Sequence, residues 1–410
     1  MGKFLKVNGL LIFTFRQTDK KKLNSYYSYY SISLMQNKAR NKYLASVSAS
    51  TVMFVYAGSV LVAFWVFSPY MRSPSQQYKI DKMKTVGKLT AAIKNAKITH
   101  SRSSDFIACP KIQEIVNEAL TYESLRAGSY TIVYGPSGIG KTELVDHTAI
   151  GKKGVVKVTL STTSTNANVV QSLTNELLGE TRSYNADFID IDLYIETIRK
   201  CGIIPTIIFD VDCSGSNDKV LYGVRKLSKE LARYCRCIIV LSDANAVLLF
   251  GIDFPSVDYI YVDEMERNEA KQLLERFNTN LTEAEMDYVF TNIGTSPLTL
   301  LLLVGRVSPT YSVNDYVAYV LRRARAQLVA FRHQPILKAL KDNPEGVSPR
   351  YFRKLEDEGA DLSNPLSVRP AMIAANVIVY RTELDKYVLK STAHRTALKS
   401  YNPIIRKHFF

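Results

Sequence analysis

Cysteine is scarce in this chain of 410 residues, and no two of its five cysteines form a C-x-x-C pair. An odd number of cysteines without paired spacing argues against a disulfide framework and against a zinc site. The composition favours a reducing compartment instead. The five residues are Cys109, Cys201, Cys213, Cys235 and Cys237.

Acidic residues are almost missing from the first quarter of the chain. Residues 1–100 hold 16 Lys and Arg but only 2 Asp and Glu, whereas the remainder holds 37 and 36. The net charge of +15 therefore belongs to the N-terminal region. An isoelectric point near 9.4 is typical of nucleic-acid binding, but this uneven placement indicates a basic segment next to a membrane.

Charge is absent altogether from the 24 residues Leu44–Phe67. At about 1.5 Å per residue, such a helix can cross the hydrocarbon core of a bilayer with some tilt. The alternative is a buried core helix, but the basic flanks favour a transmembrane helix over residues 43–68. Lys and Arg flank both ends, so the charge distribution does not decide the orientation.

The segments on either side of this run leave alternatives open. Residues 1–42 carry nine basic side chains and one acid, which fits a disordered basic tail or a targeting sequence. Residues 69–103 are predicted to form a basic linker helix, because apolar residues recur every three or four positions within 78–98. That helix either lies on anionic lipid or exposes its lysines to solvent.

Residues 135–142 have the sequence G-P-S-G-I-G-K-T, which fits the phosphate-binding pattern G-x-x-x-x-G-K-[ST]. A buried strand is predicted before the loop, at 130–134, and a helix after it, so backbone N–H groups and the helix N-terminus can surround a phosphate. The sequence thus predicts binding of ATP with Mg²⁺. The predicted contacts are Gly135, Pro136, Ser137, Gly138, Ile139, Gly140, Lys141 and Thr142, with Lys141 on the phosphates and Thr142 on the metal.

A second motif follows at Thr206–Asp210, which is an apolar strand that ends in a carboxylate. This is the Walker B pattern, in which Asp210 binds Mg²⁺ through water. The next position, where many hydrolysing relatives have Glu, is Val211. If the strand continues, Asp212 points to the same side as Asp210 and can orient the attacking water. The alternative is that Asp212 caps the turn that follows it.

Strands and helices alternate through this region. Further strands are predicted at 155–161, 237–243 and 258–262, and helices at 166–178 and 187–200. In P-loop ATPases with an inserted strand between the Walker A and Walker B strands, the polar end of that strand senses the γ-phosphate. Ser242 or Asp243 fits this role. Right-handed crossovers predict a parallel sheet with helices on both faces.

In this order, residues from about 104 to 400 resemble the STAND and archaeal-type P-loop ATPases, which are relatives of AAA+ proteins. The resemblance implies an ATPase core at 104–263 and a helical lid at 264–330. It also implies that Pro297, in Gly294-Thr295-Ser296-Pro297-Leu298, lies against the nucleotide base. No Arg lies between Leu241 and Met265, where AAA+ rings commonly supply an arginine finger.

The last part, 331–410, is predicted to be a winged-helix-like domain. Helices are predicted at 334–341, 349–355 and 365–375, with Ser348 as an N-cap, followed by a hairpin of strands 377–381 and 387–391. Arg369 is the only basic residue in the third of these helices. DNA recognition normally needs several, so nucleic acid is not an expected partner.

Together these features predict an α/β protein: a P-loop NTPase sheet, a helical lid and a winged helix, preceded by one transmembrane helix. The expected function is that of a membrane-anchored Mg-ATP-dependent switch. The alternatives are a non-hydrolysing scaffold that holds nucleotide and, less expected, a DNA-transaction ATPase. Expected partners are nucleotide, membrane lipid and an unidentified protein, and a homo-oligomer is left open. The protein is expected in a membrane, with its ATPase part in the cytosol or in the mitochondrial interior.

Overall fold

The computed structural model divides into two units, Met1–Tyr78 and Lys79–Phe410. The predicted membrane span at 44–67 and the predicted helix at 365–375 lie outside the described residues. In the part that is described, no helix is long and apolar enough to cross a membrane. The described residues are 3–7, 10–14, 74–99, 106–107, 109–121, 129–161, 169–179, 190–213, 218–243, 246–247, 250, 256–277, 279–330, 334–351, 354 and 377–401.

The first unit contains an antiparallel pair of strands, β1 (Lys3–Val7) and β2 (Leu10–Thr14). The pairing runs from Lys3 opposite Thr14 to Val7 opposite Leu10. A disordered tail was expected here. The run of apolar and β-branched residues in β2 has the strand propensity that this expectation overlooked.

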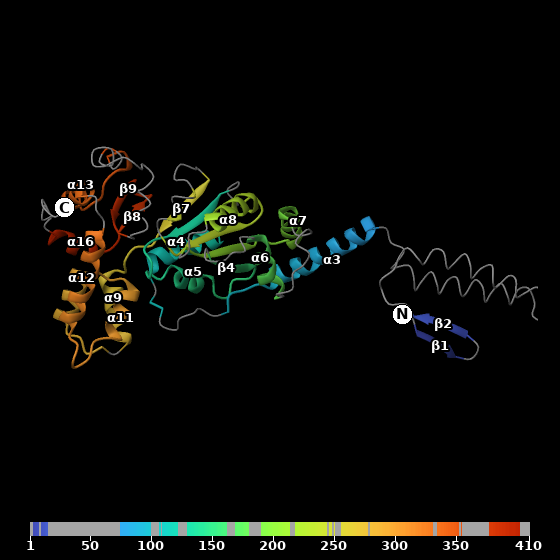
Figure 1. Cartoon of the computed structure of the whole chain (residues 1–410), viewed down its shortest axis with the longest axis horizontal. Helices are drawn as coiled ribbons and strands as arrows, with labels where there is room; N and C mark the ends of the chain where they lie inside the picture. The colour runs from blue at the N-terminus through green and yellow to red at the C-terminus, as the bar shows by residue number, and fades with distance from the viewer. Residues whose placement is uncertain are drawn as a thin grey trace, which may run out of the picture. The chain divides into compact units, whose positions relative to one another are not determined.

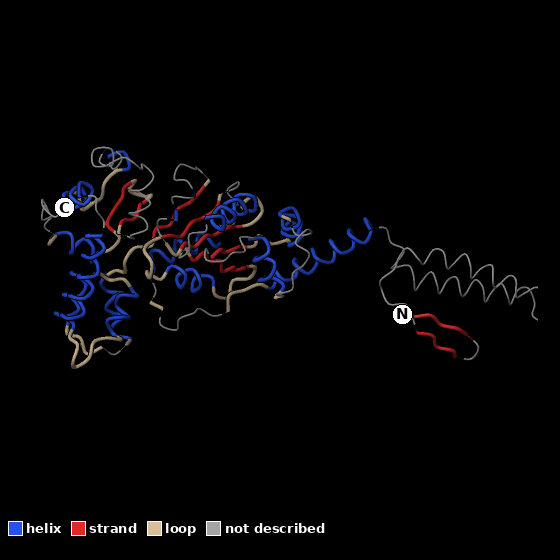
Figure 2. The backbone as a smooth tube through the Cα atoms, in the orientation of Figure 1, coloured by secondary structure: helices blue, strands red, loops and turns tan. Residues whose placement is uncertain are grey.

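The second unit is built around a five-stranded parallel sheet with the order β4-β5-β6-β3-β7 (Figure 1; Figure 2). Strand β6 lies between β3 and β5, which is the inserted-strand arrangement predicted from the sequence. The strands are β3 (Tyr130–Tyr134), β4 (Val155–Ser161), β5 (Thr206–Asp212), β6 (Arg236–Leu241) and β7 (Val257–Tyr261).

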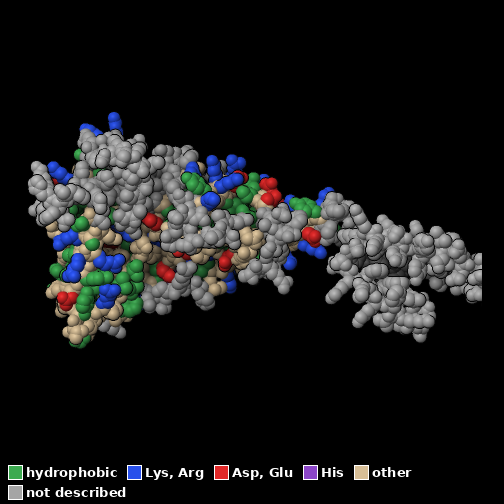
Figure 3. Space-filling model, viewed as in Figure 1, with side chains coloured by type: hydrophobic (Ala, Val, Ile, Leu, Met, Phe, Trp, Pro, Cys, Tyr) green, Lys and Arg blue, Asp and Glu red, His purple; other side chains and the backbone are tan. Residues whose placement is uncertain are grey.

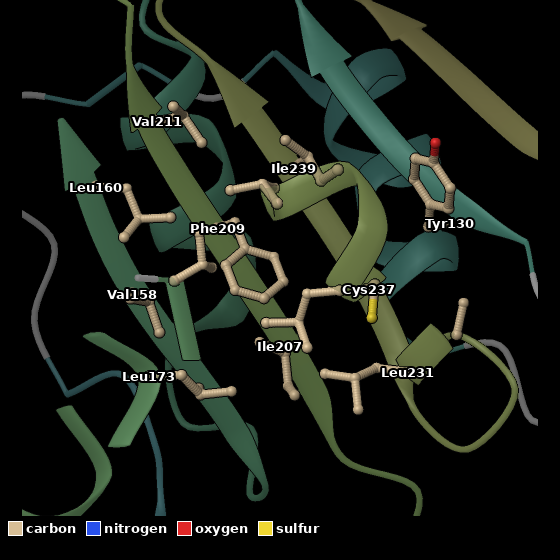
Figure 4. Packing of buried hydrophobic residues seen from close by; sticks show 14 of the residues in the cluster. Tyr130, Val158, Leu160, Leu173, Ile207, Phe209, Val211, Leu231, Cys237 and Ile239 are labelled. Atoms are coloured by element: carbon tan, nitrogen blue, oxygen red, sulfur yellow. The ribbon is translucent and has the colours of Figure 1, made fainter. Parts of the chain in front are cut away.

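Helices cover both faces of the sheet, as predicted, because alternate strand residues point to opposite sides. One face carries Phe209 and Ile239 and packs against α6, α7 and α8 (Figure 4). The other carries Ile208 and Ile238 and packs against α4 and α5. These helices are α4 (Pro110–Thr121), α5 (Lys141–Ala149), α6 (Val169–Leu178), α7 (Ile191–Cys201) and α8 (Asp218–Leu231).

Helix α7 begins at Ile191, four residues after the predicted start. The carboxylate of Asp190 accepts a hydrogen bond from the Leu193 amide at 2.8 Å and so caps the helix. Gly202, with φ of 65°, ends it. The sequence did not show which of the aspartates in this acid-rich stretch caps the helix, so the start of the helix was predicted too early.

Helix α3 (Pro74–Asn95) forms in the basic linker segment. Its buried side chains Val86, Leu89 and Ile93 belong to the main core cluster beside the sheet. Protein therefore covers this part of its apolar face. The lysines Lys84, Lys88 and Lys94 are exposed, which both alternatives for this segment require. Residues before 104 thus contribute to the core of the second unit.

The lid and the winged-helix region share one hydrophobic cluster instead of forming separate cores. Ser348 caps the helical turn at 349–351, as predicted, because its hydroxyl accepts from the Tyr351 amide. The second hairpin strand ends before the predicted residue 391, because Ser391 caps an unpredicted helix, α16. The elements are α9 (Arg267–Arg276), α10 (Glu283–Ile293), α11 (Pro297–Val304), α12 (Val313–Ala330), α13 (Gln334–Asp342), β8 (Ile378–Arg381), β9 (Lys386–Leu389) and α16 (Thr392–Lys399).

Acidic and basic side chains are interspersed on the described part of the surface in view (Figure 3). This agrees with the near balance of 37 basic and 36 acidic residues after residue 100. The charge of that part of the chain therefore does not point to a polyanionic partner.

Candidate functional site

The phosphate loop joins the end of β3 to the start of α5. Gly135, Gly138 and Gly140 have φ angles of 154°, 80° and 89°, which side-chain-bearing residues rarely adopt. A Cβ at Gly135 would also lie 2.2 Å from the carbonyl oxygen of Val262. Pro136 and Ile139 are buried, whereas Ser137 is exposed. The loop geometry therefore requires the glycines that the sequence pattern contains.

Lys141 is buried in this loop with only 5% of its surface exposed. Its Nζ donates to the carbonyl oxygens of Gly135 at 2.9 Å, Pro136 at 2.7 Å and Ser242 at 3.2 Å. All three of these acceptors are neutral. Burial lowers the pKa of Lys141 to about 8, whereas the nearby charges of Asp243 and Asp210 act in the opposite direction. An anionic phosphate fits this loop because it would add a direct counter-charge to the buried ammonium.

Thr142 and Asp210 meet where the loop helix passes the end of β5. The Thr142 hydroxyl donates to Oδ1 of Asp210 at 3.1 Å. A hydroxyl and a carboxylate are hard oxygen ligands of the kind that Mg²⁺ prefers. Among the described residues, no group of three or more His, Cys, Asp or Glu could hold a metal. Thr142 and Asp210 would therefore hold Mg²⁺ only together with water and phosphate oxygens.

The structure also brings Asp212 and Ser242 together. Strand β5 continues through Asp212, so Asp210 and exposed Asp212 share one side, while Val211 is fully buried between them. The Ser242 hydroxyl lies 3.5 Å from Oδ1 of Asp212 and accepts from the Cys213 amide at 2.7 Å. It is the carbonyl of Ser242, not its hydroxyl, that reaches Lys141. The roles predicted for both side chains stay predictions.

The lid contacts the phosphate loop through the residue after Pro297. Pro297 is the first residue of α11, and the Leu298 amide donates to the Gly138 carbonyl at 3.2 Å. A Cβ at Gly138 would come 2.6 Å from the Leu298 side chain. The sequence indicated Pro297 but not this contact of Leu298. The predicted contact between Pro297 and a base stays a prediction.

The winged-helix hairpin also reaches the end of β3. The Tyr134 hydroxyl oxygen accepts from the Thr382 amide at 2.8 Å and lies 2.8 Å from the Thr382 hydroxyl. It also lies 3.2 Å from a carboxylate oxygen of Glu383. Tyr134 immediately precedes Gly135, so the hairpin is tied directly to the start of the phosphate loop.

Two further polar contacts join the same parts. Arg381 lies 3.0 Å from the Asp263 carboxylate, and its guanidinium carbon lies 4.4 Å from the centre of the Tyr261 ring. Glu264 accepts from the backbone amide of Thr392 at 3.0 Å and from its hydroxyl at 2.7 Å. None of these contacts could be predicted from the sequence, because no local pattern marks residues that are more than a hundred positions apart and meet in the fold.

Lys390 follows β9 and is largely buried near the same site. Burial lowers its pKa, and the nearby charge of Asp243 partly offsets that effect. Its positive charge also helps to lower the pKa of Lys141. The winged helix therefore places a cation within electrostatic reach of the phosphate loop.

The sheet order, the glycine loop between β3 and α5, and the Thr142–Asp210 pair together define a P-loop NTPase fold with an inserted strand between the two Walker strands. No family model matches the sequence, and no curated protein matches it.

Several solved structures are similar to the chain. A Walker-type ATPase of Pyrococcus abyssi is 12% identical, with a TM-score of 0.48, covering 75% of this chain and 99% of that one. A STAND protein with a tetratricopeptide repeat sensor from Pyrococcus horikoshii is 17% identical, with a TM-score of 0.37. This alignment covers 75% of the chain but spans only 44% of that protein. RuvB of Thermotoga maritima is 14% identical, with a TM-score of 0.32, covering 72% and 97%.

Proposed function

We propose that this protein is a membrane-anchored Mg-ATP-binding ATPase that acts as a nucleotide-driven switch. The observation that carries the nucleotide assignment is the buried ammonium of Lys141, whose hydrogen bonds go to backbone carbonyls of the glycine loop and of Ser242. Burying an ammonium is costly, and a phosphate ligand would lower that cost.

Each residue of the site has a distinct task in this proposal. The loop amides and Lys141 bind the phosphates, and Thr142 and Asp210 hold the metal and its water. Bound Mg²⁺ would neutralise charge on the phosphate oxygens. Asp212, which lies two residues beyond Asp210, orients the attacking water. Ser242 positions Asp212 through its hydroxyl and Lys141 through its carbonyl.

The switch is proposed from the contacts between the winged helix and the loop. Tyr134 and Asp263 flank the nucleotide site on β3 and just beyond β7, and both are bonded to hairpin residues. A change of the phosphate loop on binding or hydrolysis is therefore transmitted to the hairpin. ATP would keep the lid and winged helix closed over the core, and hydrolysis would release them.

Membrane anchoring is proposed from the sequence of residues 44–67 alone. The uncharged run and its basic flanks support a single span, and the free cysteines support a reducing compartment on the ATPase side. We place that side in the cytosol or the mitochondrial interior. Carbonate extraction of the tagged full-length protein should leave it in the membrane pellet. Release into the supernatant would refute the anchor.

A second candidate is a scaffold that holds nucleotide without turnover. The observation that favours it is Val211, which fills the position after Asp210 with a fully buried apolar side chain. No carboxylate can act from that position. A DNA-transaction ATPase is less favoured, since the described surface of the second unit mixes both charges.

The test measures ATP affinity and turnover of full-length protein in detergent, for wild type and Lys141→Ala. Lys229→Ala, which removes an exposed lysine of α8, is the matched control. The proposal expects Mg²⁺-dependent binding and slow turnover in wild type and the control, and weak binding in Lys141→Ala. Equal affinity in all three proteins contradicts the site. Binding without turnover in wild type favours the scaffold.

A further inference from the structure

A lysine lies in the middle of the otherwise apolar strand β4. Lys157 points to the same side of the sheet as Val155, the side covered by α4 and α5. Its side chain is only 15% exposed. A lysine at such a position is rare unless it is paired, so its partners indicate what it does.

Its partners are the carboxylates of Asp146 and Asp210. Nζ of Lys157 donates to both oxygens of Asp146 at 2.7 Å and lies 3.1 Å from Oδ2 of Asp210. Asp146 is one helical turn beyond Thr142 in α5, so both project from one face of that helix. The other oxygen of Asp210, Oδ1, accepts from Thr142. The two oxygens of Asp210 thus contact two different partners, Lys157 and Thr142.

This arrangement fixes the orientation of a carboxylate that would otherwise rotate. Asp210 is only 7% exposed and lies near the end of β5, where a buried carboxylate needs hydrogen-bond donors. With Oδ2 on an ammonium and Oδ1 on Thr142, its plane is set relative to the metal position. Partners of this kind typically change metal affinity 10–100-fold when removed.

We propose that Lys157 is a positioning residue for the Mg²⁺ site, which holds Oδ2 of Asp210 so that Oδ1 faces Thr142 and the metal water. This rests on the proposed Mg-ATP function. Lys157 touches neither nucleotide nor metal in this proposal and acts through Asp210. Asp146 is the second partner of the ammonium and is not needed for the contact of Lys157 with Asp210 in this proposal.

The competing explanation is structural: Lys157 only neutralises the buried charge of Asp146. Removing Lys157 alone does not separate the two, because it leaves two close carboxylates uncompensated and can unfold the chain. Replacing Asp146 as well removes that problem. Lys157→Met with Asp146→Asn keeps the net charge of the cluster and nearly the same side-chain volumes, and compared with Asp146→Asn alone it removes the ammonium that contacts Asp210.

The experiment compares full-length wild type, Asp146→Asn, and Asp146→Asn with Lys157→Met. It measures the affinity for a fluorescent ATP analogue over a series of free Mg²⁺ concentrations and in excess chelator, together with the thermal unfolding temperature. We expect the single variant to resemble wild type, since its lysine still holds Asp210. We expect the double variant to need about tenfold more Mg²⁺ for half-maximal affinity, with unchanged affinity in chelator.

The outcomes separate the two levels of the proposal. Equal Mg²⁺ dependence in the single and double variants overturns the positioning role and leaves the proposed function intact. If wild type binds no nucleotide with or without Mg²⁺, the proposed function fails and the positioning role falls with it. If the double variant unfolds, Asp146→Asn with Lys157→Gln is measured in the same way, under the same expectation.

Discussion

The phosphate loop and the winged-helix hairpin lie beside each other, but they hold their charges in different ways. In the loop, the buried ammonium of Lys141 donates hydrogen bonds to neutral backbone carbonyls, so a phosphate can pair with it directly. In the hairpin, Arg381 is already paired with Asp263 and Glu383 and covers Tyr261. The side chains of this cluster are 25–45% exposed.

In the proposed switch, this difference would separate nucleotide affinity from conformational control. Nucleotide would be bound by a buried loop where water and salt have little effect. The hairpin is held against the core by partly exposed ion pairs and a few hydrogen bonds, each of which contributes little on its own. A small contact of this kind can be broken and remade without unfolding the protein.

The largest effect should follow from Lys141→Ala. Loss of a charge-assisted contact to phosphate should lower ATP affinity by about a hundredfold, or roughly 2.7 kcal/mol. Because the hydrogen bonds of Lys141 go to Gly135, Pro136 and Ser242 and not to the hairpin, hydrogen exchange of residues 378–389 in nucleotide-free protein should stay as in wild type. Faster exchange in these residues would show that the phosphate loop affects the stability of the hairpin contacts.

The winged helix itself should lose stability in acid through His394. Burial, with Lys390 and Arg395 nearby, lowers the pKa of His394 to about 4. The unfolded chain takes up a proton below its usual pKa of about 6.5, whereas the folded chain does so only near pH 4. Stability therefore falls as pH drops between about 6.5 and 4, by about 2 kcal/mol on reaching pH 5.

Denaturant unfolding of wild type and His394→Gln over pH 5–8 tests this expectation. The difference between the two proteins isolates His394, whose ring is bonded to Ser391 and Gln327 at 2.8 and 2.9 Å. The variant should lose less stability than wild type on acidification. Parallel pH curves would mean that His394 does not titrate differently in the folded chain.

The core could be predicted from sequence because its signals are local. The glycine loop, the apolar strand that ends in Asp210 and the inserted strand each occupy one short segment. Because successive side chains of a strand point to opposite faces, the sequence then also indicates which face of the sheet each strand residue covers. The position of Asp212 followed in the same way, from the continuation of β5.

The contacts around the core could not be predicted, because they join distant segments. Tyr134 and Thr382 are 248 positions apart, and Arg381 and Asp263 are 118 apart. Lys157 gave a weak local signal, a charge within an apolar strand, but its partner Asp146 lies on another element. Helix α3 was assigned to a linker because nothing in its own sequence shows that Leu89 packs beside the sheet.

A smaller effect is expected at the end of β5. Asp212→Asn should keep ATP affinity and lower turnover about tenfold, because a group that positions water acts mainly on the transition state. Asp210→Asn should instead impair both Mg²⁺-dependent binding and turnover. Steady-state rates with separate binding measurements check this contrast. An unchanged rate in Asp212→Asn would mean that this carboxylate has no catalytic role.

The smallest effect should come from Arg381→Gln, which breaks the ion pairs of the hairpin. Since these side chains are partly exposed, the docked hairpin should lose only about 0.5–1 kcal/mol, enough for roughly a two- to fivefold rise in opening. The Thr382 amide, which donates to Tyr134, should then exchange faster with deuterium. Added salt should speed this exchange in wild type more than in the variant.

Lys271→Gln is the matched control, because it breaks the exposed pair with Glu283 inside the lid and touches no hairpin residue. It should leave exchange at Thr382 unchanged. If Arg381→Gln behaves like this control, the ion pairs do not hold the hairpin, and the hydrogen bonds of Tyr134 and Glu264 must do so alone. Tyr134→Phe would then increase exchange at the Thr382 amide more than Arg381→Gln does. In that case the position of the hairpin would depend on Tyr134, the residue next to Gly135, and not on the charges of the hairpin.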